Sequence, residues 1–120
     1  LDDFKLINDS FGHDVGDTVL IQVSNIIRRE IDGKGFAARW GGEELAVYLP
    51  EANPQMGRVF ANKVLTLIEH STKPRVTASI GLATWDNYLK LTLEELLDQA
   101  DQALYKAKRL GKNRCQIITS

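Results

Sequence analysis

A pair of glycines between two short strand-like runs leaves few folds open to this chain. "FAARW" (36–40) and "ELAVYL" (44–49) contain many residues that favour strands, and Gly41-Gly42 is a favoured pair for joining antiparallel strands. The sequence therefore predicts a β-hairpin whose loop is Gly41 and Gly42. In that register Trp40 lies opposite Glu43, and Arg39 lies opposite Glu44.

Apolar residues at helical spacing lie on both sides of this hairpin. The spacing predicts a helix over 15–31, ended by "DGKG" at 32–35, and its buried face comprises Val19, Leu20, Val23, Ile26 and Ile27. A second helix begins at Asn53-Pro54. Its expected apolar stripe comprises Met56, Phe60, Val64, Leu67 and Ile68.

The last helix has the clearest boundaries, because Thr92 and Glu95 make a capping box and Gly111 closes the end. Its expected stripe comprises Leu93, Leu96, Leu97, Ala100, Ala103, Leu104 and Ala107. Residues 75–84 and "CQII" (115–118) read as strands, and "LDDFKLIND" reads as the end of a buried strand that runs into a helix. The order of elements predicts an α/β sandwich with helices packed on a sheet that includes the hairpin.

Composition excludes several classes of protein. A length of 120 residues fits one domain, and a net charge of -1 gives no pull toward nucleic acid or anionic membrane. The single cysteine, Cys115, fits a reducing cytoplasm. No apolar run reaches membrane-spanning length. The chain has no phosphate-binding loop, dinucleotide fingerprint, zinc-ligand cluster or nucleophile elbow.

Two adjacent carboxylates follow the glycines of the hairpin, and two interpretations stay open. In the first, Arg39 neutralises Glu44 and water solvates Glu43. In the second, Glu43 and Glu44 hold Mg²⁺, a hard cation that prefers oxygen ligands and is often shared with substrate phosphates. Gly41 and Gly42 would then allow a nucleotide to approach the backbone closely.

A polar segment, "DFKLINDSFGHDVGD" (3–17), holds a second group of candidate residues around Gly12 and Gly16: Lys5, Asn8, Asp9, His13, Asp14 and Asp17. The simpler interpretation is a polar loop before a helix whose first turn favours acids. The functional interpretation is that Asn8 and Asp17 together recognise the edge of a guanine.

The basic end of the last helix offers cations for phosphates. At about 100° per residue, Lys108 lies at the edge of the apolar stripe, whereas Lys106 and Arg109 lie on the far side. Lys112 follows the end of the helix. A solvated basic turn explains Lys106 and Arg109 well. It explains Lys108 less well. The alternative is that Lys108 and Lys112 are two cations beside a carboxylate site, which would suit a triphosphate.

These motifs together resemble the GGDEF family, the diguanylate cyclases of bacterial cyclic di-GMP signalling. "DFKLIND", "FGHDVGD", "ARWGGEEL", "VTASIGLA" and "ADQALYKAKRLGKNR" follow the order and spacing of the family across residues 1–120. The resemblance implies an α/β (α+β) palm-like sandwich, a mixed and mainly antiparallel sheet flanked by helices, as in nucleotide cyclases and polymerases. It also implies a fragment of a longer protein, a domain without its N-terminal helix and most of its first strand.

The resemblance further implies a function and its residues. Two subunits of a homodimer each bind GTP and condense the two into cyclic di-GMP and two pyrophosphates, with Mg²⁺ or Mn²⁺ as the cofactor. The implied metal ligands are Glu43 and the backbone carbonyl of Leu1, and Glu44 is the acidic neighbour. Lys5 is the implied transition-state contact. The implied substrate-binding residues are Asn8, His13, Asp17, Gly41, Gly42, Lys108 and Lys112.

Some residues depart from the family pattern. The first metal aspartate of the family would immediately precede Leu1, Leu45 replaces the usual Phe, and Lys112 replaces the usual Arg. "DGKG" (32–35) stands where the family has its R-x-x-D product-inhibition motif. The alternative function is therefore a degenerate module that binds GTP or a partner without turnover. In either case the resemblance implies a fused N-terminal sensory or regulatory domain, a cytoplasmic location (the parent protein could be membrane-anchored), and neither nucleic acid as a partner nor direct membrane contact by this domain.

Overall fold

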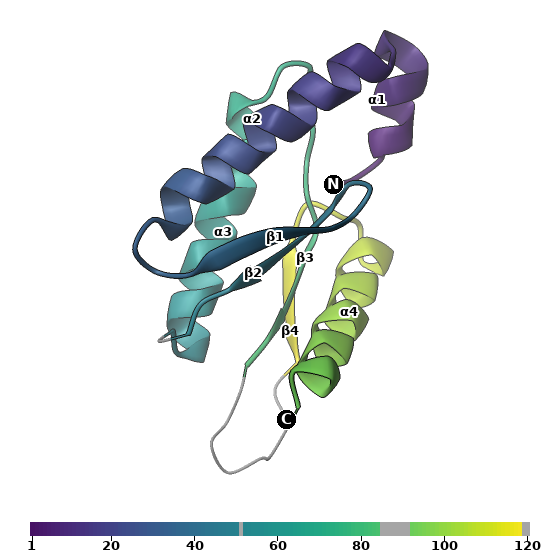
Figure 1. The fold of residues 1–120 in the computed structure, drawn as a ribbon. Helices are drawn as coiled ribbons and strands as arrows, with labels where there is room; N and C mark the ends of the chain where they lie inside the picture. The colour runs from purple at the N-terminus through teal and green to yellow at the C-terminus, as the bar shows by residue number, and fades with distance from the viewer. Residues whose placement is uncertain (51, 85–91, 119–120) are drawn as a thin grey trace.

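A computed structural model of the chain describes residues 1–50, 52–84 and 92–118. In chain order the elements are α1 (Phe4–Phe11), α2 (His13–Ile31), β1 (Phe36–Gly41), β2 (Glu44–Tyr48), α3 (Pro54–Ser71), β3 (Ile80–Ala83), α4 (Leu93–Arg109) and β4 (Cys115–Ile118), as Figure 1 shows. The expected mixture of helices and strands is confirmed. None of the helices in the described ranges is both long and apolar enough to cross a bilayer.

Strands pair in two ways. β1 and β2 form the expected antiparallel hairpin, whereas β3 and β4 pair in parallel. The backbone of residues 1 and 2 lies between the hairpin turn and the segment before β3, because the Leu1 nitrogen donates to the Glu43 carbonyl (3.1 Å) and the Asp2 N–H donates to the Thr77 carbonyl (2.9 Å). The start of the chain therefore lies close to both the hairpin and the segment before β3.

Helices cover both faces of β3. A Cβ added at Gly81 would lie 2.0 Å from the Ala100 carbonyl oxygen of α4, whereas Leu82 lies against Gly57 of α3. Neighbouring residues in a strand point to opposite faces. α4 and α3 therefore pack on opposite sides of β3, and Gly81 allows the close approach of α4.

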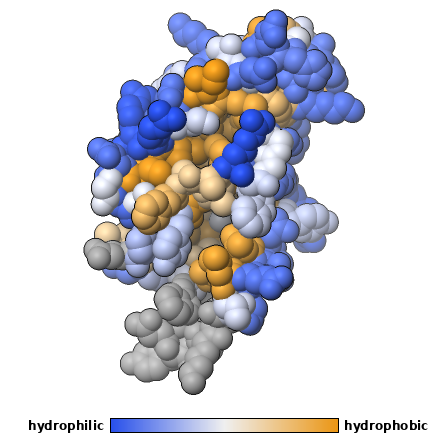
Figure 2. Space-filling model, in the orientation of Figure 1, coloured by the Kyte–Doolittle hydropathy of each residue, from blue (hydrophilic) through white to orange (hydrophobic). Residues whose placement is uncertain are grey.

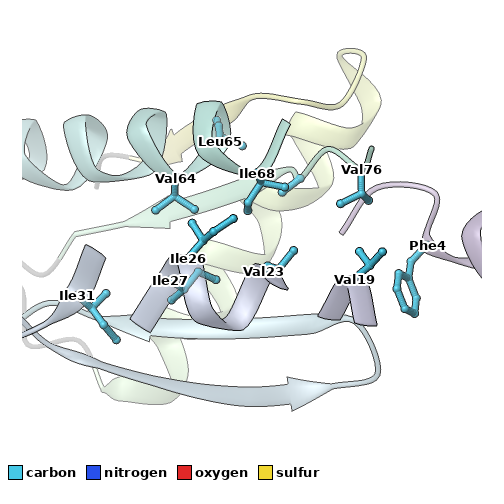
Figure 3. Packing of buried hydrophobic residues seen from close by; sticks show 11 residues of the cluster. Phe4, Val19, Val23, Ile26, Ile27, Ile31, Val64, Leu65, Ile68 and Val76 are labelled. Carbon is cyan, nitrogen blue, oxygen red and sulfur yellow. The ribbon is translucent and has the colours of Figure 1, made fainter. Parts of the chain in front are cut away.

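The main core lies between α2, α3 and the segment that leads into β3 (Figure 3). The expected buried face of α2 is confirmed, since Val19, Val23, Ile26 and Ile27 are buried and Leu20 packs against them. The stripe of α3 is only partly as expected: Val64 and Ile68 are buried, but Met56 is 55% exposed. Ala61 and Leu65 are buried in addition, because α2 contacts a face rotated toward them.

Both ends of α4 follow the sequence. Thr92 and Glu95 form the capping box, and Gly111 (φ 126°) takes the positive φ that ends the helix. The N–H groups of Gly111 and Lys112 then donate to the carbonyls of Lys108 and Ala107. The expected stripe holds except at its start, where Leu93 is 66% exposed because it lies in the first turn of the helix.

The strand expected over 75–84 is shorter than expected. Only Ile80–Ala83 forms regular pairs, with β4. Val76 and Ala78 are buried in the core, but the bond from Asp2 to Thr77 is the one backbone link between this segment and residues 1–3 among the described residues. A strand is defined by a continuous ladder, and a single bond does not make one.

The hairpin register differs from the expected one. Gly41 lies opposite Glu44 and Arg39 opposite Leu45, with an irregularity between Arg39 and Gly41. The loop is therefore Gly42 and Glu43 rather than Gly41 and Gly42. Neither glycine takes a positive φ, so the turn lacks the twist of the favoured two-glycine types. The irregularity between Arg39 and Gly41 shifts the register of β1 by one residue, as a β-bulge does, so that the strands still pair on both sides of it.

One face of the hairpin is open to solvent. Every residue of β1 is exposed, and Phe36 (71%) and Trp40 (62%) are the most exposed of its large apolar side chains. Figure 2 shows apolar residues at the surface of this face of the molecule, among hydrophilic ones.

Candidate active site

The acidic turn projects its two carboxylates into solvent. Glu43 and Glu44 are both exposed at the tip of the hairpin. Arg39 donates twice to the Gly42 carbonyl, from Nε (3.0 Å) and Nη2 (2.8 Å), and forms no ion pair with Glu44. The interpretation in which Arg39 neutralises Glu44 is therefore wrong, because the register places Arg39 opposite Leu45 and directs its guanidinium to the turn backbone.

Two consecutive carbonyls hold this turn in place. The Gly42 carbonyl accepts from Arg39, and the Glu43 carbonyl accepts from the Leu1 nitrogen at 3.1 Å. The charged groups around the Leu1 nitrogen include Asp2, Lys108, Glu43 and Glu44. Leu1, Lys108 and the acidic turn therefore share one neighbourhood.

The carboxylate of Asp2, which is not among the site residues predicted from the sequence, is buried and only 5% exposed. Its Oδ1 accepts from the Ser79 hydroxyl (2.6 Å), and its Oδ2 accepts from the Thr77 hydroxyl (2.8 Å) and from the Asn113 N–H (3.0 Å). An acid directly after the apolar Leu1, at the expected end of a buried strand, was the available signal.

Lys112 is held beside the start of α1. Its Nζ lies 2.6 Å from Oδ1 of Asp3, and the hydrogen bond to this carboxylate raises the pKa of Lys112. Lys112 therefore carries its positive charge at neutral pH. Lys108, four residues earlier on α4, is exposed, although the helical periodicity placed it at the edge of the apolar stripe.

A second group of residues lies where α1 meets α2. The Asn8 side chain packs on Gly16, since a Cβ added there would lie 1.8 Å from the Asn8 Oδ1. Asp17 is the next residue of α2 and is exposed, so these two expected base-reading residues lie on adjoining helices. His13 is exposed at the start of α2, and Lys5 is exposed on α1.

Asp17 also lines a hollow of about 450 Å³ that runs along α2 toward the hairpin. The other lining residues are Leu20, Ile21, Ser24, Asn25, Arg28 and Arg39. Sequence reasoning did not place Arg39 in this hollow, because the contact joins β1 to α2 and depends on their packing.

Comparison with known proteins identifies the family of this chain. Residues 1–114 match the family model described as diguanylate cyclase, GGDEF domain. Among curated relatives, the uncharacterized protein YtrP of Bacillus subtilis is 45% identical over 120 residues, which cover 100% of this chain and 21% of YtrP. The probable diguanylate cyclase DgcF of Escherichia coli K12 is 38% identical over 127 residues, covering 98% of this chain and 40% of DgcF. The chain thus spans about a fifth of YtrP and two fifths of DgcF.

Solved structures show the same fold. The active GGEEF domain of a diguanylate cyclase from Vibrio cholerae superposes with a TM-score of 0.89 at 32% identity, covering 99% of this chain and 78% of that one. The structure of the coiled coil and GGDEF domain of DgcB from Caulobacter crescentus, in complex with c-di-GMP, has a TM-score of 0.89 at 29% identity. The match covers 98% of this chain and 65% of that chain. The expected palm-like architecture is confirmed, and the chain belongs to the GGDEF family of diguanylate cyclase domains.

Proposed function

We propose that this domain condenses two molecules of GTP into cyclic di-GMP and two pyrophosphates. The observation that carries the proposal is the contact between the Leu1 nitrogen and the Glu43 carbonyl. It brings the segment before α1 to the acidic turn, and the ion pair of Asp3 with Lys112 places a cation beside the same segment. Acids and cations at one place suit a nucleoside triphosphate.

The acidic turn fits a divalent cation shared with the substrate. Within residues 1–50, 52–84 and 92–118, neither Glu43 nor Glu44 accepts a side-chain hydrogen bond or forms an ion pair, and no cluster of three or more ligating side chains exists. Mg²⁺ is commonly held by one or two carboxylates together with substrate phosphates and water. Glu43 and the Leu1 carbonyl would hold Mg²⁺ or Mn²⁺, which supplies charge stabilisation at the reacting phosphate.

The remaining residues bind and orient GTP. Asp17 would accept from the N1–H and exocyclic amine of guanine, with Asn8 beside it and His13 at the start of α2. Gly41 and Gly42 have open space where a Cβ would stand, so a nucleotide can come close to the turn. Lys108 and Lys112 would bind the phosphates, and Lys5 would contact the transferred phosphoryl group.

In each half-reaction a 3′-oxygen forms a bond to the α-phosphorus of the other GTP. The bond from that phosphorus to the bridging oxygen breaks, pyrophosphate leaves, and the 3′-hydroxyl proton passes to the acidic turn. Two domains facing each other as a homodimer would bring the two GTP molecules close together.

We also place the domain in the cytoplasm, downstream of a regulatory domain, with no nucleic acid partner and no direct membrane contact.

Product formation tests this proposal. The full-length protein, in an activated state, is incubated with GTP and Mg²⁺ and the products are separated, with Glu43→Ala as the control. Cyclic di-GMP is expected from the wild type and not from the control. GTP binding without any cyclic dinucleotide would instead support the degenerate module, which neither the family match nor the named relatives favour.

A further inference from the structure

The Asp2 carboxylate connects two segments that lie far apart in the chain. Thr77 and Ser79 before β3 donate to it, and so does the backbone of Asn113 after α4. The preceding residue, Leu1, contacts the acidic turn. A side chain that is 5% exposed and accepts three hydrogen bonds is held in one orientation by its surroundings.

The loop that carries Lys112 needs such an anchor. Lys112 (φ 64°) and Asn113 (φ 48°) both lie in the left-handed region, which is unfavourable for a lysine and better tolerated by an asparagine. The Lys112 N–H donates to the Ala107 carbonyl (3.0 Å), and the next N–H donates to Asp2 (3.0 Å). The peptide groups on both sides of the Lys112 Cα are therefore fixed, one by α4 and the other by Asp2.

Asp2 is poorly placed to be a metal ligand itself. Both of its oxygens already accept from protein donors, and its side chain is buried, whereas the acidic turn is exposed. Its charge therefore faces hydroxyl and amide donors of the protein. This separates the role of Asp2 from that of Glu43.

We propose that Asp2 is a positioning residue that holds Lys112 in place for a nucleotide phosphate. The inference rests on the proposed function, since Lys112 has this task only if the domain binds GTP. Asp2 acts through the Asn113 N–H and touches no substrate. Its loss should weaken nucleotide binding through Lys112, and should leave the Mg²⁺ requirement of the acidic turn unchanged.

A double-mutant cycle on the full-length protein tests this. Binding of a non-hydrolysable GTP analogue is measured for the wild type, Asp2→Ala, Lys112→Ala and the double variant. Loss of one charge-assisted contact to phosphate should weaken binding by about tenfold in each single variant. The double variant should bind no more than about twofold more weakly than Asp2→Ala.

A conservative variant separates position from charge. In Asp2→Asn the amide oxygen can still accept from Thr77 and Asn113, and the Ser79 hydroxyl can turn to accept from the new amide N–H. Binding within about threefold of the wild type is expected, at an unchanged Mg²⁺ dependence. Asp98→Asn, at an exposed carboxylate on α4, is the matched control.

Three results would overturn the inference. The first is wild-type affinity in a folded Asp2→Ala protein, which would leave Asp2 a stabilising role only. The second is a full additional effect of Lys112→Ala in the Asp2→Ala background. The third is an altered Mg²⁺ dependence in Asp2→Asn, which would make Asp2 a metal residue.

A second set of variants and the choice of binding as the measured quantity keep the test decisive. If Asp2→Ala does not fold, the same cycle is run on Thr77→Val/Ser79→Ala, which keeps the carboxylate but removes two of its three donors. In the Thr77→Val/Ser79→Ala background, Lys112→Ala should weaken binding of the GTP analogue less than it does in the wild type. An equal loss of binding in both backgrounds would refute the inference. Because binding and not turnover is measured, a protein that binds GTP but forms no product contradicts the proposed reaction and leaves the inference to be judged by the cycle.

Discussion

The ammonium group of Lys112 lies 2.6 Å from Oδ1 of Asp3, so the lysine that we assign to phosphate binding already has a carboxylate partner. The pair joins the loop after α4 to the residue before α1. A phosphate arriving at Lys112 must share or replace this carboxylate.

We expect Asp3→Asn to bind a GTP analogue about two- to fivefold more tightly at low ionic strength, since an exposed ion pair contributes little and the negative charge next to the phosphates is removed. The gain should shrink at high salt, where surface charges are screened. Titration of the analogue at two salt concentrations measures this. Weaker binding would show that Asp3 holds Lys112 in place rather than competing for it.

Arg39 should matter for catalysis through the turn that it holds. Arg39→Ala removes both hydrogen bonds to the Gly42 carbonyl, so the turn that carries Glu43 becomes less ordered. We expect kcat to fall about tenfold or more, and Arg39→Lys to be intermediate because an ammonium group lacks the planar fork. Arg29→Ala, at an exposed arginine on α2, is the control, and steady-state kinetics the measurement. Equal kcat in Arg39→Ala and the wild type would contradict this role.

Base choice should depend on Asp17. Adenine has no N1–H or 2-amino group to donate, so an ATP complex leaves a polar group unsatisfied at a cost of about 1–3 kcal/mol. The wild type should therefore prefer GTP over ATP by about tenfold or more. Asp17→Ala should lose most of this preference, whereas Asp14→Ala, one turn earlier on α2, should keep it. Competition binding of GTP and ATP measures this preference in each variant. Equal affinities for the two nucleotides in the wild type would refute the assignment of Asp17 to guanine recognition.

Gly81→Ala should destabilise the fold. The new Cβ would meet the Ala100 carbonyl oxygen at 2.0 Å and the Leu104 nitrogen at 2.4 Å, and these are backbone atoms of α4 that cannot rotate away. We expect a loss of about 3 kcal/mol in the free energy of unfolding. The matched control is Gly57→Ala, whose Cβ would meet only the Leu82 side chain at 3.3 Å. That variant should stay within about 1 kcal/mol of the wild type in urea denaturation.

Acid stability should involve Glu69. The Arg75 hydrogen bond lowers the pKa of Glu69 below its ordinary value of 4.5, with help from the Asn113 amide. A carboxyl group with a lowered pKa in the folded state stabilises the protein above pH 4.5, and the contribution is lost as the pH falls through the folded pKa. The Tm difference between the wild type and Glu69→Gln should therefore be largest near neutrality and shrink below pH 4.5. A difference that stays constant on acidification, or one matched by Asp101→Asn, would be inconsistent with this.

Local signals in the sequence predicted most of the elements. The capping box of Thr92 with Glu95 depends on residues three apart, and the buried face of α2 depends on helical spacing, so both could be read directly. The family motifs likewise identified Glu43 and Lys112 as candidates. Relations between segments were harder to predict. The α3 stripe rotated toward Ala61 and Leu65 because α2 decides which face of α3 is covered.

The sequence by itself determined α2, α3, α4, the presence of the hairpin and the family, because these depend on periodicity, caps and the order of short motifs. The tertiary structure decided what the charged side chains contact. Arg39 could pair with Glu44 or with the backbone of its own turn, and the bulge in β1 selected the backbone. Asp2 became a buried anchor because donors from residues 77, 79 and 113 meet around it. Contacts between residues so distant in the chain form only when several elements pack together, and no local pattern encodes them.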